Sequence, residues 1–150
     1  DRSFYGAVRV MDDGPWRRFV HGTTMHGVQS LDPELAHTPT GYYGPLTPIG
    51  SAIMALNEAG RADRVGVLGL GAGATACYAR PGQHWTYYEI DPLVVQVAQD
   101  RRFFTFLSDC APDAQIVIGG ARLALARQPP GAYDLLLHAR ERGAHGPVVQ

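Results

Sequence analysis

Three alternate glycines, Gly69, Gly71 and Gly73, and one acidic residue, Glu89, have the types and spacing of a nucleotide site. Glycine adopts backbone angles closed to other residues and lets a ligand approach the main chain closely. The free N–H groups of a helix that follows such a turn suit an electron-rich or anionic group. Glu89 follows Gly69 by about 20 residues, the spacing at which an acid at a strand end accepts hydrogen bonds from ribose hydroxyls.

Two apolar runs must position these residues. One run, at 65–68, leads into the glycines, and a second, at 85–88, ends at Glu89, with a small-residue segment at 72–79 between them. This order predicts a strand, a tight turn, a helix and a second strand. Asp91 and Pro92 then have the types of an N-cap and a first helical residue. The glycine turn alone is a weak motif, and its context makes it more specific.

The remaining segments predict an antiparallel start and an alternating α/β continuation. We expect strands at 3–11, 16–21, 22–29, 64–69, 85–89, 114–118 and 133–138, and helices at 49–57, 72–79, 92–99 and 122–127. The segment 101–107 is assigned to a helix end and a loop. This pattern predicts a small β N-terminal domain at 1–47 and a Rossmann-like domain at 48–150 with a parallel, methyltransferase-type sheet.

The last expected strand, 133–138, is apolar on both faces, as a central strand of a parallel sheet should be. At an edge it would be an aggregation risk. We therefore expect the parallel sheet to be incomplete at the C-terminus of this chain. An edge of this kind also leads us to expect a homo-oligomer.

The composition and charge of the chain limit the classes of binding partner that we expect. The 150 residues carry a formal net charge of −1, so nucleic-acid binding has little electrostatic support. No apolar run is long enough for a membrane span and the N-terminus does not resemble a signal peptide, so we expect a cytoplasmic protein. Cys77 and Cys110 lack metal-ligand spacing, and we expect both to be reduced. The six histidines, His21 and His26 among them, form no convincing metal pair. No metal is expected.

Ala74 bears on whether the glycine turn favours a dinucleotide such as NAD over another nucleotide-like ligand. It stands where the G-x-G-x-x-G pattern has its last glycine, a position at which alanine is often allowed. The unit therefore suits an adenosyl sulfonium ligand as well as NAD.

Further segments resemble the spermidine synthase-like (polyamine aminopropyltransferase) family. The residues that carry the resemblance are SFYG at 3–6, HGTTMHGVQ at 21–29, TPTGYYGP at 38–45, GLGAGA at 69–74, YYEIDP at 87–92 and FFTFLSD at 103–109. The likeness extends from residue 3 to about residue 137. It is closest to bacterial members in which this domain stands alone or is fused to a membrane-embedded segment.

The resemblance implies decarboxylated S-adenosylmethionine as aminopropyl donor and a diamine such as putrescine as acceptor, with no prosthetic group. Gln29 would line the donor pocket from the N-terminal domain, although from the residues alone it could be a loop-end amide. The three glycines would bring the donor close to the main chain, and Glu89 would hold the ribose hydroxyls.

The acceptor side departs from the family pattern. Tyr42 and Tyr43 would lie over the cleft, or be ordinary core or rim aromatics. Gly120 stands where the family has an aspartate for the adenine amino group. His138 stands where it has an aspartate near the transferred group, and the residues after it, Arg140, Glu141 and Arg142, are a poor lining for a polyamine. A histidine could act as a base, but it cannot supply a fixed negative charge.

Three functions therefore remain open. The first is aminopropyl transfer, which we expect to be weak or absent in this chain, with His138, Tyr42 and Tyr43 as catalytic candidates. The second is methyl transfer from S-adenosylmethionine to a small molecule. The third is a non-catalytic adenosyl-binding or assembly domain. In all three, the adenosyl ligand would be held by Gln29, the three alternate glycines, Glu89 and the Gly120 position.

Overall fold

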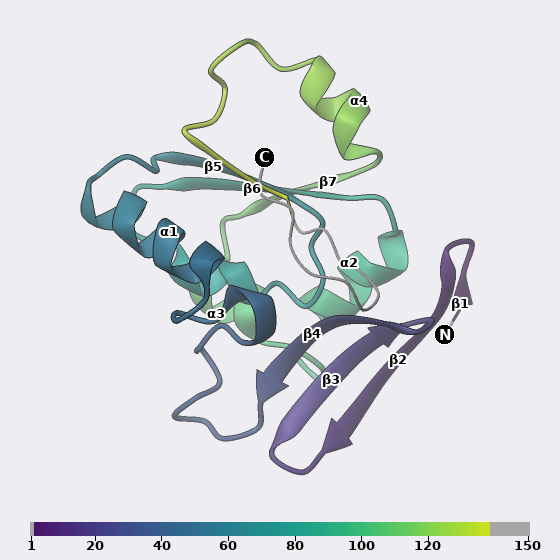
Figure 1. Cartoon of the computed structure of the whole chain (residues 1–150). Helices are drawn as coiled ribbons and strands as arrows, with labels where there is room; N and C mark the ends of the chain where they lie inside the picture. The colour runs from purple at the N-terminus through teal and green to yellow at the C-terminus, as the bar shows by residue number, and fades with distance from the viewer. Residues whose placement is uncertain (1, 139–150) are drawn as a thin grey trace.

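The computed structural model describes residues 2–138, with the side chains of residues 2 and 3 left aside (Figure 1). The N-terminal part is an antiparallel sheet in the order β1-β2-β3-β4. Its strands are β1 (Arg2–Ser3), β2 (Gly6–Asp13), β3 (Trp16–His21) and β4 (Thr24–Ser30). Asp13 pairs with Trp16, and the turn between these two residues closes the first long hairpin. The expected antiparallel start is confirmed.

The second part is a parallel sheet with the strand order β7-β6-β5-β8. Its strands are β5 (Arg64–Leu68), β6 (His84–Glu89), β7 (Gln115–Ile118) and β8 (Leu135–His138). The chain moves outward from β5 to β7 and then returns, so that β8 pairs with β5 on its other side. Such a reversal is the point at which open α/β sheets bind ligands, outside the carboxyl ends of the strands. The chain thus has the predicted Rossmann-like, methyltransferase-type fold.

Helices cover the two faces of the parallel sheet unequally. Figure 1 shows α4 (Ala121–Ala126) on one face and α1 (Pro48–Glu58), α2 (Pro92–Gln99) and α3 (Phe106–Cys110) on the other. Short 3₁₀ segments lie at η1 (Gly41–Tyr43) and η2 (Ala74–Tyr78). Two of the helices begin as their sequences predict: Thr47 accepts a hydrogen bond from the Gly50 N–H and Asp91 from the Leu93 N–H, each followed by proline.

The core lies mainly on the side of α1, α2 and α3. Ile53, Val65, Tyr87, Phe104 and Phe106 are all fully buried there. On the other side, Val117, Leu123 and Leu136 are 36%, 69% and 46% exposed. The hydrophobic contacts that hold the sheet therefore favour one of its faces.

Three of the expected elements differ in the structure. The single strand expected at 3–11 is divided into β1 and β2 by a turn at residues 4 and 5. In place of the helix expected at 72–79 there is only the 3₁₀ segment η2, which ends at Tyr78. Pro81 explains this end, because a residue that precedes proline avoids the helical region. The segment at 101–107, expected to end a helix, instead leads into a new short helix, α3.

The strand β8 pairs with β5 and lies at an edge of the sheet among the described residues. The final segment of the sequence, with Arg140, Glu141 and Arg142, lies outside those residues. Across residues 2–138, none of the helices has the length and apolar character that a membrane crossing requires.

Candidate functional site

The turn after β5 is shaped by its glycines. Gly69, Gly71 and Gly73 all have positive φ angles, of 93°, 55° and 84°. At Gly73 a side chain is excluded twice, because the φ is left-handed and a Cβ would lie 2.9 Å from Leu107 Cγ. The Gly69 N–H donates to the carbonyl of Tyr88 at 2.8 Å, which ties the turn to the end of β6.

Glu89 locks the turn in place from the end of β6. Its side chain is buried, and one carboxylate oxygen accepts from the Leu70 N–H at 2.9 Å. The other accepts from the Asp91 N–H, also at 2.9 Å. Each carboxylate oxygen has a further lone pair, so two ribose hydroxyls could still donate to Glu89. The predicted neighbourhood of glycine turn and acid is present.

A cavity of about 180 Å³ opens above this turn. Its lining comes from the glycine turn, the strand β4 and the segment around η1, together with Glu89. The residues are His26, Gly27, Thr40, Tyr43, Val67, Gly69, Leu70, Gly71, Ala72, Ala74, Thr75 and Glu89. The cavity therefore lies at the carboxyl ends of β5 and β6, with the N-terminal sheet forming one wall.

The strand β4 is pressed directly against the glycine turn. The Ala72 N–H donates to the carbonyl of His26 at 3.1 Å. A Cβ placed on Gly27 would lie only 2.4 Å from the Ala72 Cβ. The rings of Phe19 and Phe104 also meet, with centroids 5.8 Å apart, and so join the two parts of the chain. The wall of the cavity is thus held by close backbone packing.

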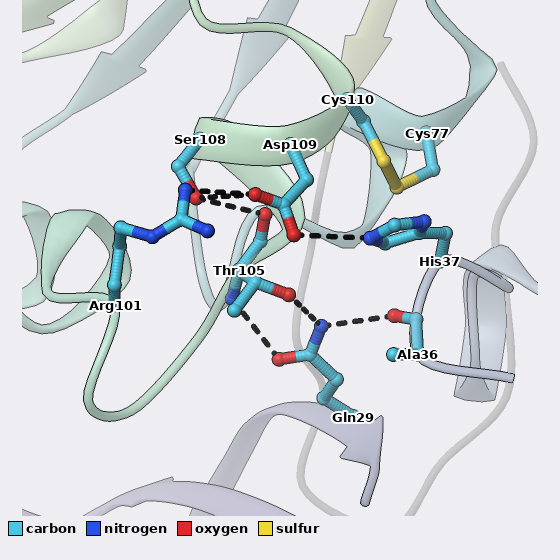
Figure 2. Close-up of polar contacts among 9 residues, drawn as sticks. All are labelled: Gln29, Ala36, His37, Cys77, Arg101, Thr105, Ser108, Asp109 and Cys110. Atoms are coloured by element: carbon cyan, nitrogen blue, oxygen red, sulfur yellow. Dashed lines mark hydrogen bonds and ion pairs between the residues drawn. A yellow bond between two sulfur atoms is a disulfide. The ribbon is translucent and has the colours of Figure 1, made fainter. Parts of the chain in front are cut away.

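Gln29 makes contacts other than those expected of a donor-pocket residue. Its amide nitrogen donates to the Ala36 carbonyl and to Thr105 Oγ1, each at 2.9 Å. Its amide oxygen accepts from the Thr105 N–H at 3.1 Å, as Figure 2 shows. These bonds join β4 to the start of α3, and Gln29 is not among the residues that line the cavity. Its contact with a donor stays a prediction.

The structure separates the two tyrosines. The Tyr42 side chain is 73% exposed and does not line the cavity. Tyr43 does line it, and its carbonyl accepts a hydrogen bond from the Tyr78 hydroxyl. Only Tyr43 is therefore placed to contact a ligand in this cavity.

Gly120 follows the carboxyl end of β7 and His138 ends β8. These are the two outer strands of the sheet, and neither residue lines the cavity. The Gly119 N–H donates to the Glu89 carbonyl at 2.8 Å, so Gly120 comes directly beside the end of β6. A Cβ on Gly120 would meet nothing within 4 Å. His138 pairs with Leu68 at the end of β8 and is exposed. Position 120 therefore has space for the aspartate that the family resemblance implies there. A catalytic role for His138 stays a prediction.

The prediction that Cys77 and Cys110 are reduced is wrong. The two residues form a disulfide, with Cα atoms 4.8 Å apart, that links η2 to α3 (Figure 2). A spacing of 33 residues along the chain gives no hint of this proximity. Disulfides persist mainly in oxidising surroundings, so the predicted cytoplasmic location has lost the cysteine argument that supported it.

A charged cluster lies at the same end of α3 as the disulfide (Figure 2). The Asp109 carboxylate contacts His37 Nε2 at 3.0 Å and Arg101 Nη1 at 2.8 Å. The hydrogen bond with His37, followed by that from Arg101, holds the pKa of Asp109 below its ordinary value. This cluster therefore fastens the loop before η1 to the helix that supports the glycine turn.

Tyr87 lies beneath the cavity and stays neutral. Burial raises the pKa of its phenol far above the ordinary value, and its hydroxyl shares a hydrogen bond of 3.0 Å with Thr75. This pair fixes Thr75, which lines the cavity. Within residues 2–138, the His, Cys, Asp and Glu side chains form no group of three or more that could hold a metal ion.

Residues that the sequence reasoning did not single out also belong to the site. His26, Thr40 and Thr75 line the cavity. The signal for His26 is its place in the HGTTMHGVQ segment, which carries part of the family resemblance. The signal for Thr75 was its place two residues after the last alternate glycine.

Several solved structures superpose on this chain. The spermidine synthase from Thermotoga maritima superposes with a TM-score of 0.62 and 14% identity, over 99% of this chain and 46% of that one. A spermidine synthase in complex with the transition-state analogue AdoDATO has a TM-score of 0.62 and 13% identity, over 92% of this chain and 45% of the other. The cofactor-bound Rv0187 from MTB is 25% identical with a TM-score of 0.47, over 59% and 41%.

No protein-family model and no curated protein matches the chain. The chain spans less than half the length of the two spermidine synthases. At these identities the likeness shows the fold, which agrees with the strand order of the parallel sheet.

Proposed function

We propose that this chain binds an adenosyl sulfonium compound in the cavity and transfers its aminopropyl group to an amine. The observation that carries the proposal is the position of Glu89, whose buried carboxylate is fixed against the glycine turn and lines the cavity. A carboxylate held in this way is ready to accept hydrogen bonds from the two hydroxyls of a ribose. Both similar spermidine synthases share this fold, and one was solved with an adenosyl transition-state analogue.

The reaction would need little from the protein beyond placement. The lone pair of the acceptor nitrogen attacks the carbon next to the sulfonium, a C–N bond forms and the C–S bond breaks. The electron pair of that bond stays on sulfur, which leaves as a neutral thioether, and the nitrogen releases one proton to a base. Holding the nitrogen and carbon in line supplies most of the acceleration in such a step.

We expect slow turnover with putrescine. Among the described residues, Glu89 is the only carboxylate that lines the cavity, and both of its oxygens already accept backbone hydrogen bonds. The Gly120 position supplies no side chain, and His138 is exposed. A dicationic diamine would therefore find little negative charge there.

The same observation favours a second candidate, methyl transfer from S-adenosylmethionine to an acceptor without permanent positive charge. The donor contacts would be the same, and the lack of further carboxylates would then be no obstacle. The third candidate, an adenosyl-binding domain that assembles with a second copy, would use the β8 edge, where Leu136 is 46% exposed. Homo-oligomer formation stays a prediction.

Calorimetric titration with decarboxylated S-adenosylmethionine, S-adenosylmethionine and NAD, followed by turnover assays with putrescine and with monoamines, separates these functions. We expect the two sulfonium compounds to bind and NAD to bind more weakly. Tight binding of NAD alone, or no heat from any of the three at millimolar concentration, would remove the proposal. Normal turnover with putrescine would overturn the expected impairment.

A further inference from the structure

His26 offers the cavity a proton-accepting group. The ionisable side chains that belong to lining residues are those of His26, Tyr43 and Glu89. Both Glu89 oxygens accept backbone N–H bonds, so this carboxylate is committed to holding the turn. Histidine is the side chain that titrates near neutral pH and most often serves as a general base.

A second histidine lies behind the first. The rings of His21 and His26 have centroids 5.1 Å apart. The ring of Phe19 also packs against His26, with its centroid 5.5 Å from that of His26. The His21 side chain is only 10% exposed, and its Nε2 atom is buried without a hydrogen-bond partner. A buried polar nitrogen of this kind carries an energetic cost that packing alone does not explain.

Asp91 faces that buried nitrogen. Its Oδ2 atom lies 3.9 Å from His21 Nε2, beyond hydrogen-bond length but within the range of charge attraction. The Asp91 side chain is 2% exposed, and its other oxygen accepts from the Leu93 N–H at the start of α2. The Asp91 N–H in turn donates to Glu89. The aspartate is therefore rigidly placed between the ribose-binding candidate and the histidines.

We propose that the His26 imidazole accepts the proton released by the acceptor amine, and that His21 and Asp91 are positioning residues that fix this imidazole. The inference rests on the proposed function and names the base of the same site. As the C–N bond forms, the nitrogen gains positive charge and passes one proton to the His26 imidazole. The Asp91 carboxylate, 3.9 Å from His21 Nε2, adds negative charge to this group of side chains.

This arrangement assigns to His26 the role that the sequence pattern gave to His138. His26 lines the cavity beside the glycine turn, whereas His138 is exposed and lies outside the lining. A base must come within hydrogen-bond reach of the proton that it takes, and position therefore decides between the two residues.

Kinetics with matched variants tests the base. We compare His26→Gln with His138→Gln, and use His84→Gln, at the exposed opposite end of β6, as the control. We expect His26→Gln to lower kcat by about 100-fold or more, with little change in donor KM, because general base catalysis supplies that range. His138→Gln and His84→Gln should retain wild-type kcat. A large loss in His138→Gln with an active His26→Gln would overturn the proposal.

Nuclear magnetic resonance of the imidazole nitrogens tests the positioning residues without turnover. Asp91→Asn retains a good N-cap for α2 while removing the charge, and Asp113→Asn is the exposed control. We expect Asp91→Asn and His21→Gln to shift the His26 nitrogen signals, and Asp113→Asn to leave them unchanged. Unmoved His26 signals in a folded Asp91→Asn protein would remove the positioning roles.

The same spectra separate a failure of this inference from a failure of the proposed function. 5′-Methylthioadenosine, the thioether product of aminopropyl transfer, serves as the probe, with calorimetry to show that it binds. We expect it to shift the signals of His26 and not those of His138. Binding without a change at His26 would overturn the inference and leave the adenosyl site standing. No binding would remove the proposed function, and the effect of Asp91→Asn in the free chain would still decide whether the histidines are coupled.

Discussion

The carboxyl ends of the central strands and of the outer strands of the parallel sheet are built very differently. At the central strands β5 and β6, the tight side of the comparison, the glycine turn, Glu89 and β4 are joined by hydrogen bonds and by contacts that leave no room for a Cβ at Gly27. At the outer strands β7 and β8, the open side, Gly120 faces open space and Ile118 is 55% exposed. The described part of the chain is therefore closely packed where we propose that an adenosyl ligand binds, and sparse where the proposed acceptor would lie.

This difference bears separately on the two parts of the proposed function, ligand binding and acceptor chemistry. The tight side depends on backbone groups and small residues, whose positions are set by packing. The open side would depend on acidic side chains that the sequence lacks at Gly120 and His138. Ligand binding and acceptor chemistry can thus be separated by experiment.

Removing the Glu89 carboxylate should have the largest effect. In Glu89→Ala, the buried N–H groups of Leu70 and Asp91 lose their acceptor, at a cost of about 1–3 kcal/mol each in the free energy of unfolding. Binding of the adenosyl ligand should also be lost. Urea unfolding and calorimetry measure both effects, with Glu58→Ala on the exposed end of α1 as control. Wild-type affinity in a folded Glu89→Ala protein would contradict this assignment.

Breaking the disulfide should come next. It closes a loop of 33 residues between η2 and α3, and its loss should lower the free energy of unfolding by about 2–4 kcal/mol. The double variant Cys77→Ser, Cys110→Ser and the reduced wild-type protein should show the same loss in urea unfolding. If a reductant leaves the wild-type midpoint unchanged, the bond does not support the tight side.

Two glycine substitutions compare the two sides directly. Gly27→Ala would place its Cβ 2.4 Å from that of Ala72, and should cost about 1–3 kcal/mol as β4 is pushed from the glycine turn. Gly120→Ala has open space and a φ of −65°, so its unfolding free energy should stay equal or rise slightly. Equal losses in both variants, measured by thermal unfolding, would contradict the contrast in packing.

Gly120→Asp should sharpen the comparison by filling the open side. The new carboxylate would stand at the N-cap of α4, a position that favours aspartate. The family resemblance implies an aspartate at this position for the adenine amino group. We expect several-fold tighter binding of S-adenosylmethionine in calorimetry, with Gly120→Asn as the uncharged control. Unchanged affinity would show that the adenine lies elsewhere.

The smallest effect should come from acid titration of the cluster around Asp109. Its pKa is lowered in the folded protein, so the stability that it contributes is present above the ordinary aspartate pKa of about 3.9 and is lost as pH falls through the lower folded value. An ion pair this close to the surface contributes about 0.2–1 kcal/mol. The difference between wild type and Asp109→Asn in urea unfolding should therefore be present at about pH 5 and shrink below about pH 4. A difference that does not shrink below about pH 4 would contradict this assignment.

Much of the fold followed from local patterns in the sequence. The strand, turn, strand and acid order from β5 to Glu89 was predicted because glycine, alternating or continuous apolar runs and N-caps act over a few residues. The start of α2 at Asp91 and Pro92 was confirmed for the same reason. The helix expected after the glycine turn was wrong in kind and length, and Pro81 was the signal that could have shortened it.

The sequence by itself therefore determined the α/β order, the turn conformation and the position of the acid, since these depend on neighbouring residues along the chain. Only the tertiary structure decided that Cys77 meets Cys110, that Gln29 spans to Thr105, and that His26 rather than His138 lines the cavity. The disulfide depends on how α3 packs against η2, and the other two depend on how β4 packs across the glycine turn. That packing is set by contacts between segments distant in sequence, whose separation no local spacing records.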